Sequence, residues 1–339
     1  MRIGLLDIGS HTAHLRIADL TPGLPPWPVT SHKRAIRLAA GTDRSGTIDD
    51  AAVRRLVAAV GEAVAVAESY QVDVLLPFAT SSVRDAANRE AVLAEVRAAT
   101  GVEVSHMDGE EEARLTFLAA RGWYGWSAGT MLLLDIGGGS LEIAHGAGRE
   151  PAFAVSLPLG AGRLTRDHLP AAGPSRGRDV KALRRHVRSV LARPAAVVGG
   201  LPRPALGVAA SKTFTQLACL TGAPRPKAGP HVPRTLDRAA LGGWIPRLAA
   251  LPVADRARLP GVSATRARQI LAGAVVAEAL MDLLRIERLQ VCPWALREGI
   301  LLHRLRELEG VSAGRVVPLR PFARAAGGSG GVAGARVSR

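Results

Sequence analysis

A short glycine-containing segment occurs twice in the sequence, and its residue types suit the binding of phosphate. The first copy reads Leu5-Leu6-Asp7-Ile8-Gly9-Ser10, and the second reads Leu133-Leu134-Asp135-Ile136-Gly137-Gly138-Gly139-Ser140. Glycines at a turn let the backbone approach a ligand closely, and consecutive N–H groups with a serine hydroxyl can surround an anion. The aspartate at the end of the preceding strand would repel a bare phosphate. Each copy therefore predicts a phosphate held with a cation such as Mg²⁺, and the duplication disfavours a pair of ordinary solvated turns.

Three consecutive glutamates, Glu110-Glu111-Glu112, begin a helix that is predicted to run to about Arg121. Carboxylates are favoured at a helix N-terminus, so a charged first turn is one interpretation. A carboxylate that faces the two glycine loops could instead act as a general base, taking a proton from water that attacks a terminal phosphoryl group. The pattern by itself does not choose among the three glutamates.

Two further segments follow predicted strands. Thr80-Ser81-Ser82-Val83-Arg84 follows a strand ending at Ala79, at the edge where ligands bind in open α/β sheets. Arg84 could bind a phosphate with two N–H groups, or it could pair with Asp85 on the surface.

Ser211-Lys212-Thr213 follows a predicted strand and resembles the end of a P-loop, but the glycine before the lysine is missing. We therefore expect a phosphate contact there and no P-loop.

Alternating strands and helices are predicted to position these groups. Each glycine loop joins two short apolar segments, which predicts two β-hairpins and two similar half-molecules. The alternation favours a mainly parallel sheet covered by helices on both faces. The predicted elements are a helix through residues 53–64, strands at Val72–Ala79, Val102–Val104, Met131–Asp135 and Leu206–Ala210, and helices at about 86–99 and 110–121.

The composition indicates a globular protein with an anionic partner. The chain has 339 residues, which suggests about two domains, and its 44 Lys and Arg exceed its 29 Asp and Glu to give a net charge of +15. Aromatic residues make up only 4%, which disfavours a nucleic-acid surface built on stacked rings. The chain lacks an apolar run of the roughly 18 residues that a membrane span needs, a signal-peptide pattern and a disulfide framework, so we expect a cytoplasmic protein without a membrane partner. Residues 312–339 are glycine-rich and basic, which predicts a flexible tail.

Several motifs occur in the order found in the exopolyphosphatase and guanosine pentaphosphate phosphatase (Ppx/GppA) family. These motifs are Asp7-Ile8-Gly9-Ser10, Ala79-Thr80-Ser81 with Arg84, Gly109-Glu110-Glu111-Glu112-Ala113-Arg114-Leu115, and Asp135-Ile136-Gly137-Gly138-Gly139-Ser140-Leu141-Glu142. The segment Ala295-Leu296-Arg297-Glu298-Gly299 also fits, so the resemblance covers residues 1 to about 308. Trp123-Tyr124-Gly125-Trp126-Ser127-Ala128-Gly129 and Cys292-Pro293-Trp294 resemble the short actinobacterial exopolyphosphatases.

The resemblance implies a duplicated, actin-like (ribonuclease H-like) α/β fold, with domains over 1–126 and 127–311 around a central cleft. It implies that Glu112 activates water and that Asp135 and Glu142 bind Mg²⁺ or another divalent cation. A homodimer is also expected. The residues implied in phosphate binding are Ser10, Arg84, Gly137, Gly138, Gly139, Ser140 and Arg266.

The implied reaction is hydrolysis of the terminal phosphoanhydride of inorganic polyphosphate, with release of orthophosphate. A basic channel would hold this polyanion in a salt-dependent manner. The same residues would also serve two alternatives, which are hydrolysis of guanosine pentaphosphate (pppGpp) and non-catalytic sensing of polyphosphate or (p)ppGpp. Glu112 in its family context disfavours an actin-like ATPase or a sugar kinase.

The chain departs from the usual family pattern at a few positions. His11-Thr12 stands where Asn-Ser is usual, and Arg268 replaces an acid. Lys212 stands where glycine is common, and the added cation suits an anionic substrate. The sequence ends before the extra C-terminal helical domains of longer relatives, from which we expect a preference for shorter polyphosphate.

Overall fold

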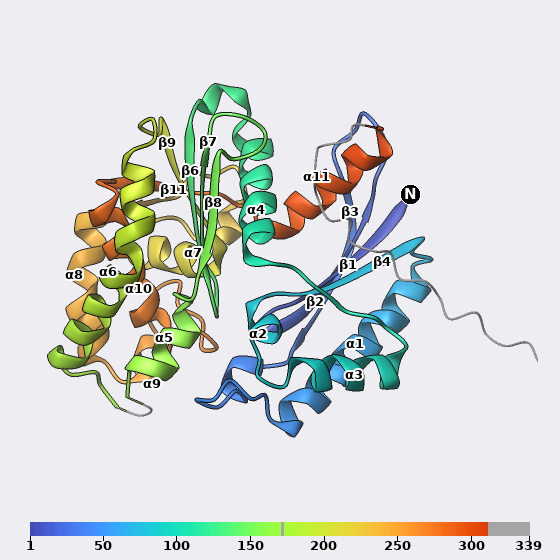
Figure 1. Ribbon diagram of the computed structural model, residues 1–339, viewed down its shortest axis with the longest axis horizontal. Coiled ribbons are helices and arrows are strands. Elements are labelled where there is room, and N and C mark those ends of the chain that lie inside the picture. The colour runs from blue at the N-terminus through green and yellow to red at the C-terminus, as the bar shows by residue number, and fades with distance from the viewer. Residues whose placement is uncertain (171–172, 311–339) are drawn as a thin grey trace, which may run out of the picture.

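The computed structural model describes residues 1–170 and 173–310, and it contains two β-sheets with helices between and around them (Figure 1). We call the parts of the chain built on these sheets the first and second halves. The first sheet has the order β3-β2-β1-β4-β5, and the second has the order β10-β11-β9-β6-β7-β8. The tail predicted over 312–339 lies outside the described residues.

The strands have the following bounds. The first sheet contains β1 (Arg2–Ile8), β2 (Thr12–Asp19), β3 (Trp27–Ala35), β4 (Val74–Ala79) and β5 (Ser105–His106). The second contains β6 (Met131–Ile136), β7 (Leu141–Gly146), β8 (Phe153–Leu157), β9 (Leu206–Ala210), β10 (Thr235–Asp237) and β11 (Arg288–Val291).

The helices alternate with these strands along most of the chain, as the sequence pattern predicts. They are α1 (Asp50–Ser69), α2 (Ser81–Arg84), α3 (Arg89–Thr100), α4 (Gly109–Tyr124), α5 (Ala161–His168), α6 (Gly177–Gly199), α7 (Ser211–Leu220), α8 (Arg238–Ala250), α9 (Val253–Arg256), α10 (Ile270–Leu283) and α11 (Leu296–Leu308). None of the helices in the described part of the chain is long and apolar enough to cross a membrane.

Both predicted hairpins are present. The strands β1 and β2 pair antiparallel, and so do β6 and β7, so each glycine loop is a hairpin turn. The parallel pairs β1–β4 and β6–β9 place Ala79 opposite Ile8 and Ala210 opposite Asp135. The segments that follow β4 and β9 therefore begin beside the two loops.

Two expectations about the sheets were wrong. Both sheets are mixed, because each hairpin adds antiparallel pairs to a parallel core, and hydrophobic alternation does not encode strand direction. The strand expected at Val102–Val104 is displaced to β5. Val102 and Val104 are instead buried in the core beneath α1 and α3 without joining the sheet ladder.

The helix α4 shares a core with each sheet. Leu115 and Leu118 on one side of α4 pack with Leu5 of β1, and Phe117 on another side packs with Leu133 of β6. The helix α11 packs with α4 and the first sheet through residues such as Ile300. In Figure 1, α4 accordingly stands between the two sheets, with α11 beside it. The first turn of α4 is thereby held at the junction of the two halves.

Candidate active site

Both loop aspartates lie on the sheet faces that α4 covers. Side chains alternate between the faces of a strand, so Asp7 shares a face with Leu5, and Asp135 shares a face with Leu133. Leu5 and Leu133 belong to the two cores that α4 joins. This arrangement directs both carboxylates toward the same helix, which carries the three glutamates in its first turn.

The two glycine loops are in close contact with the opposite half. A methyl group added to Gly138 would lie 2.2 Å from Oγ of Ser10, and one added to Gly139 would lie 2.6 Å from Oγ of Ser81. Neither position has room for a side chain, which is the physical reason for glycine there. The N–H of Gly137 donates to the carbonyl of Ser140 at 2.9 Å and closes the second loop. The predicted phosphate-binding loops thus converge on one place.

Glu112 is the glutamate that faces this place. The Asp108 side chain accepts a hydrogen bond of 2.8 Å from the N–H of Glu111, which caps α4 and fixes the start of the helix. One turn later, Oε2 of Glu112 lies 3.1 Å from Nη1 of Arg84, and both side chains are 14% exposed. Glu110 instead pairs with Arg114 on the surface at 2.8 Å.

Glu111 differs from Glu112 in its neighbours rather than in its pKa. Burial and the nearby Asp108 and Glu150 raise the pKa of Glu111 to about 7. Glu112 also has a pKa of about 7, because burial, Asp135 and Asp7 raise it more than Arg84 lowers it. Only Glu112 is therefore close to the charged groups of both loops.

The Arg84 guanidinium donates hydrogen bonds to Asp85, Met107 and Glu112. Its Nε donates to Oδ1 of Asp85 at 3.0 Å, so the ion pair that was the alternative to phosphate binding is present. Its Nη1 donates to Glu112 and to the carbonyl of Met107. The guanidinium is thereby held beside Glu112.

Four carboxylates lie close together at this junction, and a bound cation would reduce their mutual repulsion. They belong to Asp7, Glu112, Asp135 and Glu142. Burial together with Glu112 and Asp135 raises the pKa of Glu142 well above its usual range, against hydrogen bonds from Ser140 and Ser156. Burial also raises the pKa of Asp135 to about 6, and the pKa of Asp7 is raised as well. Glu142 is only 1% exposed, and its Oε1 accepts a hydrogen bond of 2.8 Å from Ser156.

These oxygen donors suit Mg²⁺. Within the described residues, no group of three or more His, Cys, Asp or Glu side chains is arranged to hold a metal by itself. Mg²⁺ usually takes one or two protein carboxylates and completes its shell with water and substrate phosphates, so a pair of carboxylates beside a phosphate loop fits it. Asp135 lies opposite Glu142 in the β6–β7 hairpin, which places the pair on one face of the second sheet.

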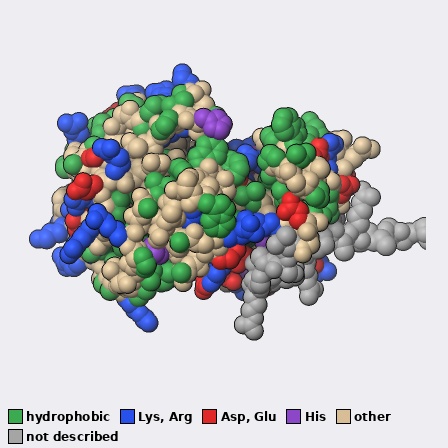
Figure 2. Space-filling view, turned by 90° about the horizontal axis from the view of Figure 1, so that it is seen from above, with side chains coloured by type: hydrophobic (Ala, Val, Ile, Leu, Met, Phe, Trp, Pro, Cys, Tyr) green, Lys and Arg blue, Asp and Glu red, His purple; other side chains and the backbone are tan. Residues whose placement is uncertain are grey.

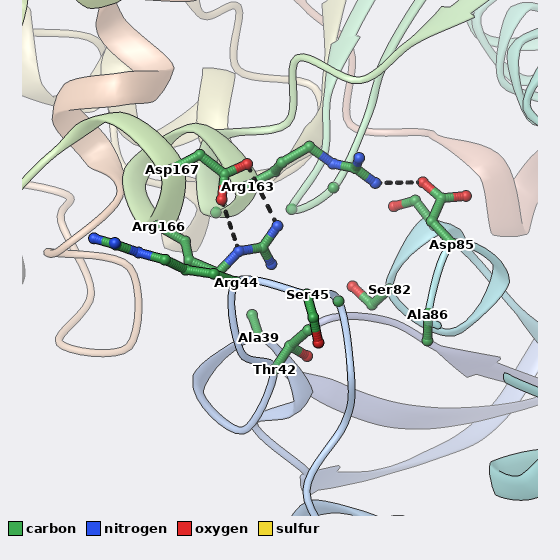
Figure 3. A pocket seen from close by; sticks show the side chains of 15 residues that line it. Ala39, Thr42, Arg44, Ser45, Ser82, Asp85, Ala86, Arg163, Arg166 and Asp167 are labelled. Carbon is green, nitrogen blue, oxygen red and sulfur yellow. Dashed lines mark hydrogen bonds and ion pairs between the residues drawn. The ribbon is translucent and has the colours of Figure 1, made fainter. Parts of the chain in front are cut away.

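Two arginine-lined cavities open beside the loops. The first, of about 220 Å³, is lined by Gly138, Gly139, Ser81 and a set of charged side chains from both halves (Figure 3). In Figure 3, Arg163 of α5 extends to Asp85, and the ion pair measures 2.6 Å. The neighbouring cavity, of about 490 Å³, has an arginine-rich lining that comprises Arg37, Arg44, Arg166 and Arg268.

Arg266 lies near the carboxylates rather than in these cavities. Burial lowers the pKa of its guanidinium, and Asp135 opposes that effect. The structure therefore brings the predicted residues of both loops, Arg84, Glu112, Glu142 and Arg266 to one junction.

Ser156 and Asp7 were not among the predicted site residues. The repeated Asp-Ile-Gly pattern pointed to Asp7, whereas no motif marks Ser156.

The chain matches the Ppx/GppA phosphatase family over residues 16–308. The protein belongs to this family. It is 50% identical over 329 residues to Exopolyphosphatase 1 of Mycobacterium tuberculosis, an alignment that covers 97% of this chain and 95% of that protein. It is 25% identical to the guanosine-5'-triphosphate,3'-diphosphate pyrophosphatase of Aeromonas salmonicida, over 87% of this chain and 58% of that one.

The Ppx/GppA fold is also evident in solved structures. The crystal structure of an exopolyphosphatase from Cytophaga hutchinsonii superimposes with a TM-score of 0.81 over 93% of this chain and 100% of its own, at 24% identity. The α/β architecture of two sheets, each with a glycine-loop hairpin, that was expected from the sequence is thereby confirmed. In this Ppx/GppA chain, the hairpin loops and the α4 glutamate occupy the junction between the two sheets.

Proposed function

We propose that this protein is an exopolyphosphatase that hydrolyses the terminal phosphoanhydride of inorganic polyphosphate. The observation that carries the proposal is the convergence of Glu112 and Arg84 on two phosphate-type loops in mutual contact. The 50% identity to a protein named Exopolyphosphatase 1 supports the choice of substrate. The arginine-lined cavities beside the loops supply positive charge for a polyanion.

In the proposed reaction, the terminal phosphoryl group lies between the loops, where N–H groups of Gly138 to Ser140 and the Ser10 hydroxyl donate to its oxygens. Glu112 accepts a proton from a water molecule as the water oxygen forms a bond to phosphorus. The bond from phosphorus to the bridging oxygen breaks, which releases orthophosphate and a chain one unit shorter. A pKa of about 7 leaves much of Glu112 ionised at neutral pH while keeping it basic enough to take the proton.

Asp135 and Glu142 would hold a divalent cation such as Mg²⁺, which neutralises charge on phosphate oxygens when it is bound. Other residues of the chain orient these carboxylates and supply positive charge. Ser156 and Ser140 donate to Glu142, which favours its ionised form and fixes its orientation. Arg84 supplies a fixed positive charge beside Glu112 and the phosphoryl site.

A second candidate substrate is guanosine pentaphosphate. The cavity of about 490 Å³ is large enough for a nucleoside, and its lining includes Ala39, Ala40 and Ala264 beside the arginines. The relative in Aeromonas salmonicida is named for a guanosine nucleotide substrate. A nucleoside in this cavity would place its phosphates toward the same loops.

The test is release of orthophosphate from polyphosphate of several lengths, guanosine pentaphosphate and ATP, each with Mg²⁺. We expect polyphosphate to be cleaved in clear excess over both nucleotides, and comparison of its lengths measures the chain-length preference. Release chiefly from guanosine pentaphosphate would favour the second candidate. Binding of polyphosphate without any release would favour a sensor.

The proposal extends to a homodimer in the cytoplasm, on the resemblance to the family and the charge and composition of the chain. Sedimentation of the purified protein measures the oligomeric state. A monomer at all concentrations would contradict that part of the proposal and would leave the assignment of the reaction unchanged.

A further inference from the structure

A row of polar side chains crosses the first sheet at the end of β1. Asp7 lies opposite His14 in the β1–β2 pair, and His14 lies opposite Lys33 in the β2–β3 pair. Residues directly opposite one another in antiparallel strands point to the same face. Lys33 is thus placed on the face that carries Asp7, two strands away from the loop aspartate.

Arg297, in the first turn of α11, joins this row. Its Nη1 donates to Nδ1 of His14, and its Nε lies 3.9 Å from Oδ2 of Asp7. Burial and the neighbouring cations lower the pKa of His14 to about 3, so the imidazole is neutral and accepts this hydrogen bond. The histidine therefore positions the guanidinium without adding a charge.

Lys212 approaches the row from the second half. It is the second residue of α7, which begins directly after β9, and Ser211 beside it is hydrogen-bonded to Asp135. Burial lowers the pKa of Lys212, and so does its proximity to Lys33, Arg297 and Arg266. Burial, Arg297 and Arg266 also lower the pKa of Lys33, and Asp7 opposes them. Cations from both halves are therefore crowded beside the loop junction.

Two of the three cations in this cluster are lysines, and these differ from the paired arginines of the first cavity. Arg163 and Arg166 are each paired with an aspartate, at 2.6 and 2.8 Å. Among residues 1–170 and 173–310, neither Lys33 nor Lys212 has an ion pair, and neither lines those cavities. Asp7 offsets part of the charge of Lys33 and Arg297, but these cations and Lys212 still repel one another, so a bound anion would relieve the repulsion.

We propose that Lys33, Lys212 and Arg297 form a second phosphoryl subsite, which binds internal units of the polyphosphate chain while the terminal unit lies between the glycine loops. The substrate class rests on the proposed function. The ammonium groups supply point charges, and the guanidinium supplies directed N–H donors for phosphate oxygens. Because the subsite is contributed by both halves, a chain bound across it also holds the halves together.

The test measures binding in a Glu112→Gln background, so that the result does not depend on turnover. Polyphosphate and tripolyphosphate are titrated by calorimetry at several salt concentrations into Lys212→Ala, Lys33→Ala and the double variant. Lys181→Ala is the matched control, because Lys181 is an exposed lysine on α6, on the outer side of the second half (Figure 1), where Figure 2 shows many Lys and Arg side chains.

We expect each lysine variant to weaken polyphosphate binding roughly tenfold and to reduce the slope of log affinity against log salt by about one. Binding of tripolyphosphate should weaken less, and Lys181→Ala should match the parent. Unchanged affinity and slope in the double variant would overturn the proposal. Weaker binding of orthophosphate with unchanged affinity for the polyphosphate chain would also overturn it, since the cluster would then bind the product.

Two further measurements distinguish loss of the subsite from a folding defect and from failure of the proposed reaction. Removing a cation from a repelling cluster should not lower the melting temperature, and Lys212→Gln provides a second variant if Lys212→Ala does. Failure of the proposed function would appear as no orthophosphate release from polyphosphate by the wild-type protein. Failure of the subsite would appear only in the binding data.

Discussion

Arg84 donates a hydrogen bond of 3.1 Å from Nη1 to Oε2 of Glu112, across a junction where three other carboxylates raise local negative charge. The ion pair has two effects. It orients the carboxylate toward the glycine loops, and it keeps the pKa of Glu112 lower than burial and its acidic neighbours alone would set it. The general base and its counter-charge come from α4 and α2, two helices that both begin at the loop junction.

Replacing Glu112 with Gln should lower kcat on polyphosphate by roughly a hundredfold to ten thousandfold, because the base is removed while size and hydrogen bonding are nearly retained. Calorimetric affinity for polyphosphate should change little. Glu110→Gln is the matched control, since Glu110 lies in the same helical turn but pairs with Arg114 on the surface. Equal activities of the two variants would refute the assignment of Glu112.

The activity should rise with pH through about 7, because Glu112 acts as a base only in its ionised form and its pKa is about 7. Arg84 stabilises that ionised form, so Arg84→Ala should move the acidic limb of kcat/KM to higher pH. The measurement is kcat/KM against pH for both proteins at constant Mg²⁺. A limb that stays in place or moves to lower pH would contradict this account.

Ser156→Ala should raise the Mg²⁺ concentration needed for half-maximal activity by about tenfold to a hundredfold. The variant removes the 2.8 Å hydrogen bond to Glu142, which then loses one of the two interactions that favour its ionised form. A Mg²⁺ titration of activity, and of the melting temperature without substrate, measures the change. The Cβ that packs against Gly109 is retained, so we expect the fold to be preserved. An unaltered Mg²⁺ requirement would show that Ser156 does not position the carboxylate.

Gly138→Ala should abolish most activity through loss of loop contact. The new methyl group would lie 2.2 Å from Oγ and 2.7 Å from Cβ of Ser10, so the two halves must separate slightly at the phosphate site. Gly242→Ala on α8 is the control, because a methyl group there meets nothing within 4 Å. Orthophosphate release and melting temperature are measured for both variants. Full activity of Gly138→Ala would mean that the loops do not need this close approach.

Much of the site was predictable because the informative features are local. The Asp-Ile-Gly pattern predicts a hairpin turn from neighbouring residues alone, and both copies in this chain form one. Neighbouring residues in the sequence do not show which of the three glutamates faces the site. Glu110, Glu111 and Glu112 share one helical turn, and a pKa raised to about 7 is common to Glu111 and Glu112. The contact with Arg84 and the proximity of the loop aspartates distinguish Glu112.

The sequence by itself determined the loops, the hairpins and the start of α4, because turn geometry and capping depend on neighbouring residues. Only the tertiary structure decided which charges meet. His14 and Arg297 are separated by 283 positions, and the side chains that surround the junction come from both sheets, α4, α7 and α11. Coulomb energies and pKa values depend on distance in space and on burial, and neither is encoded by separation along the chain.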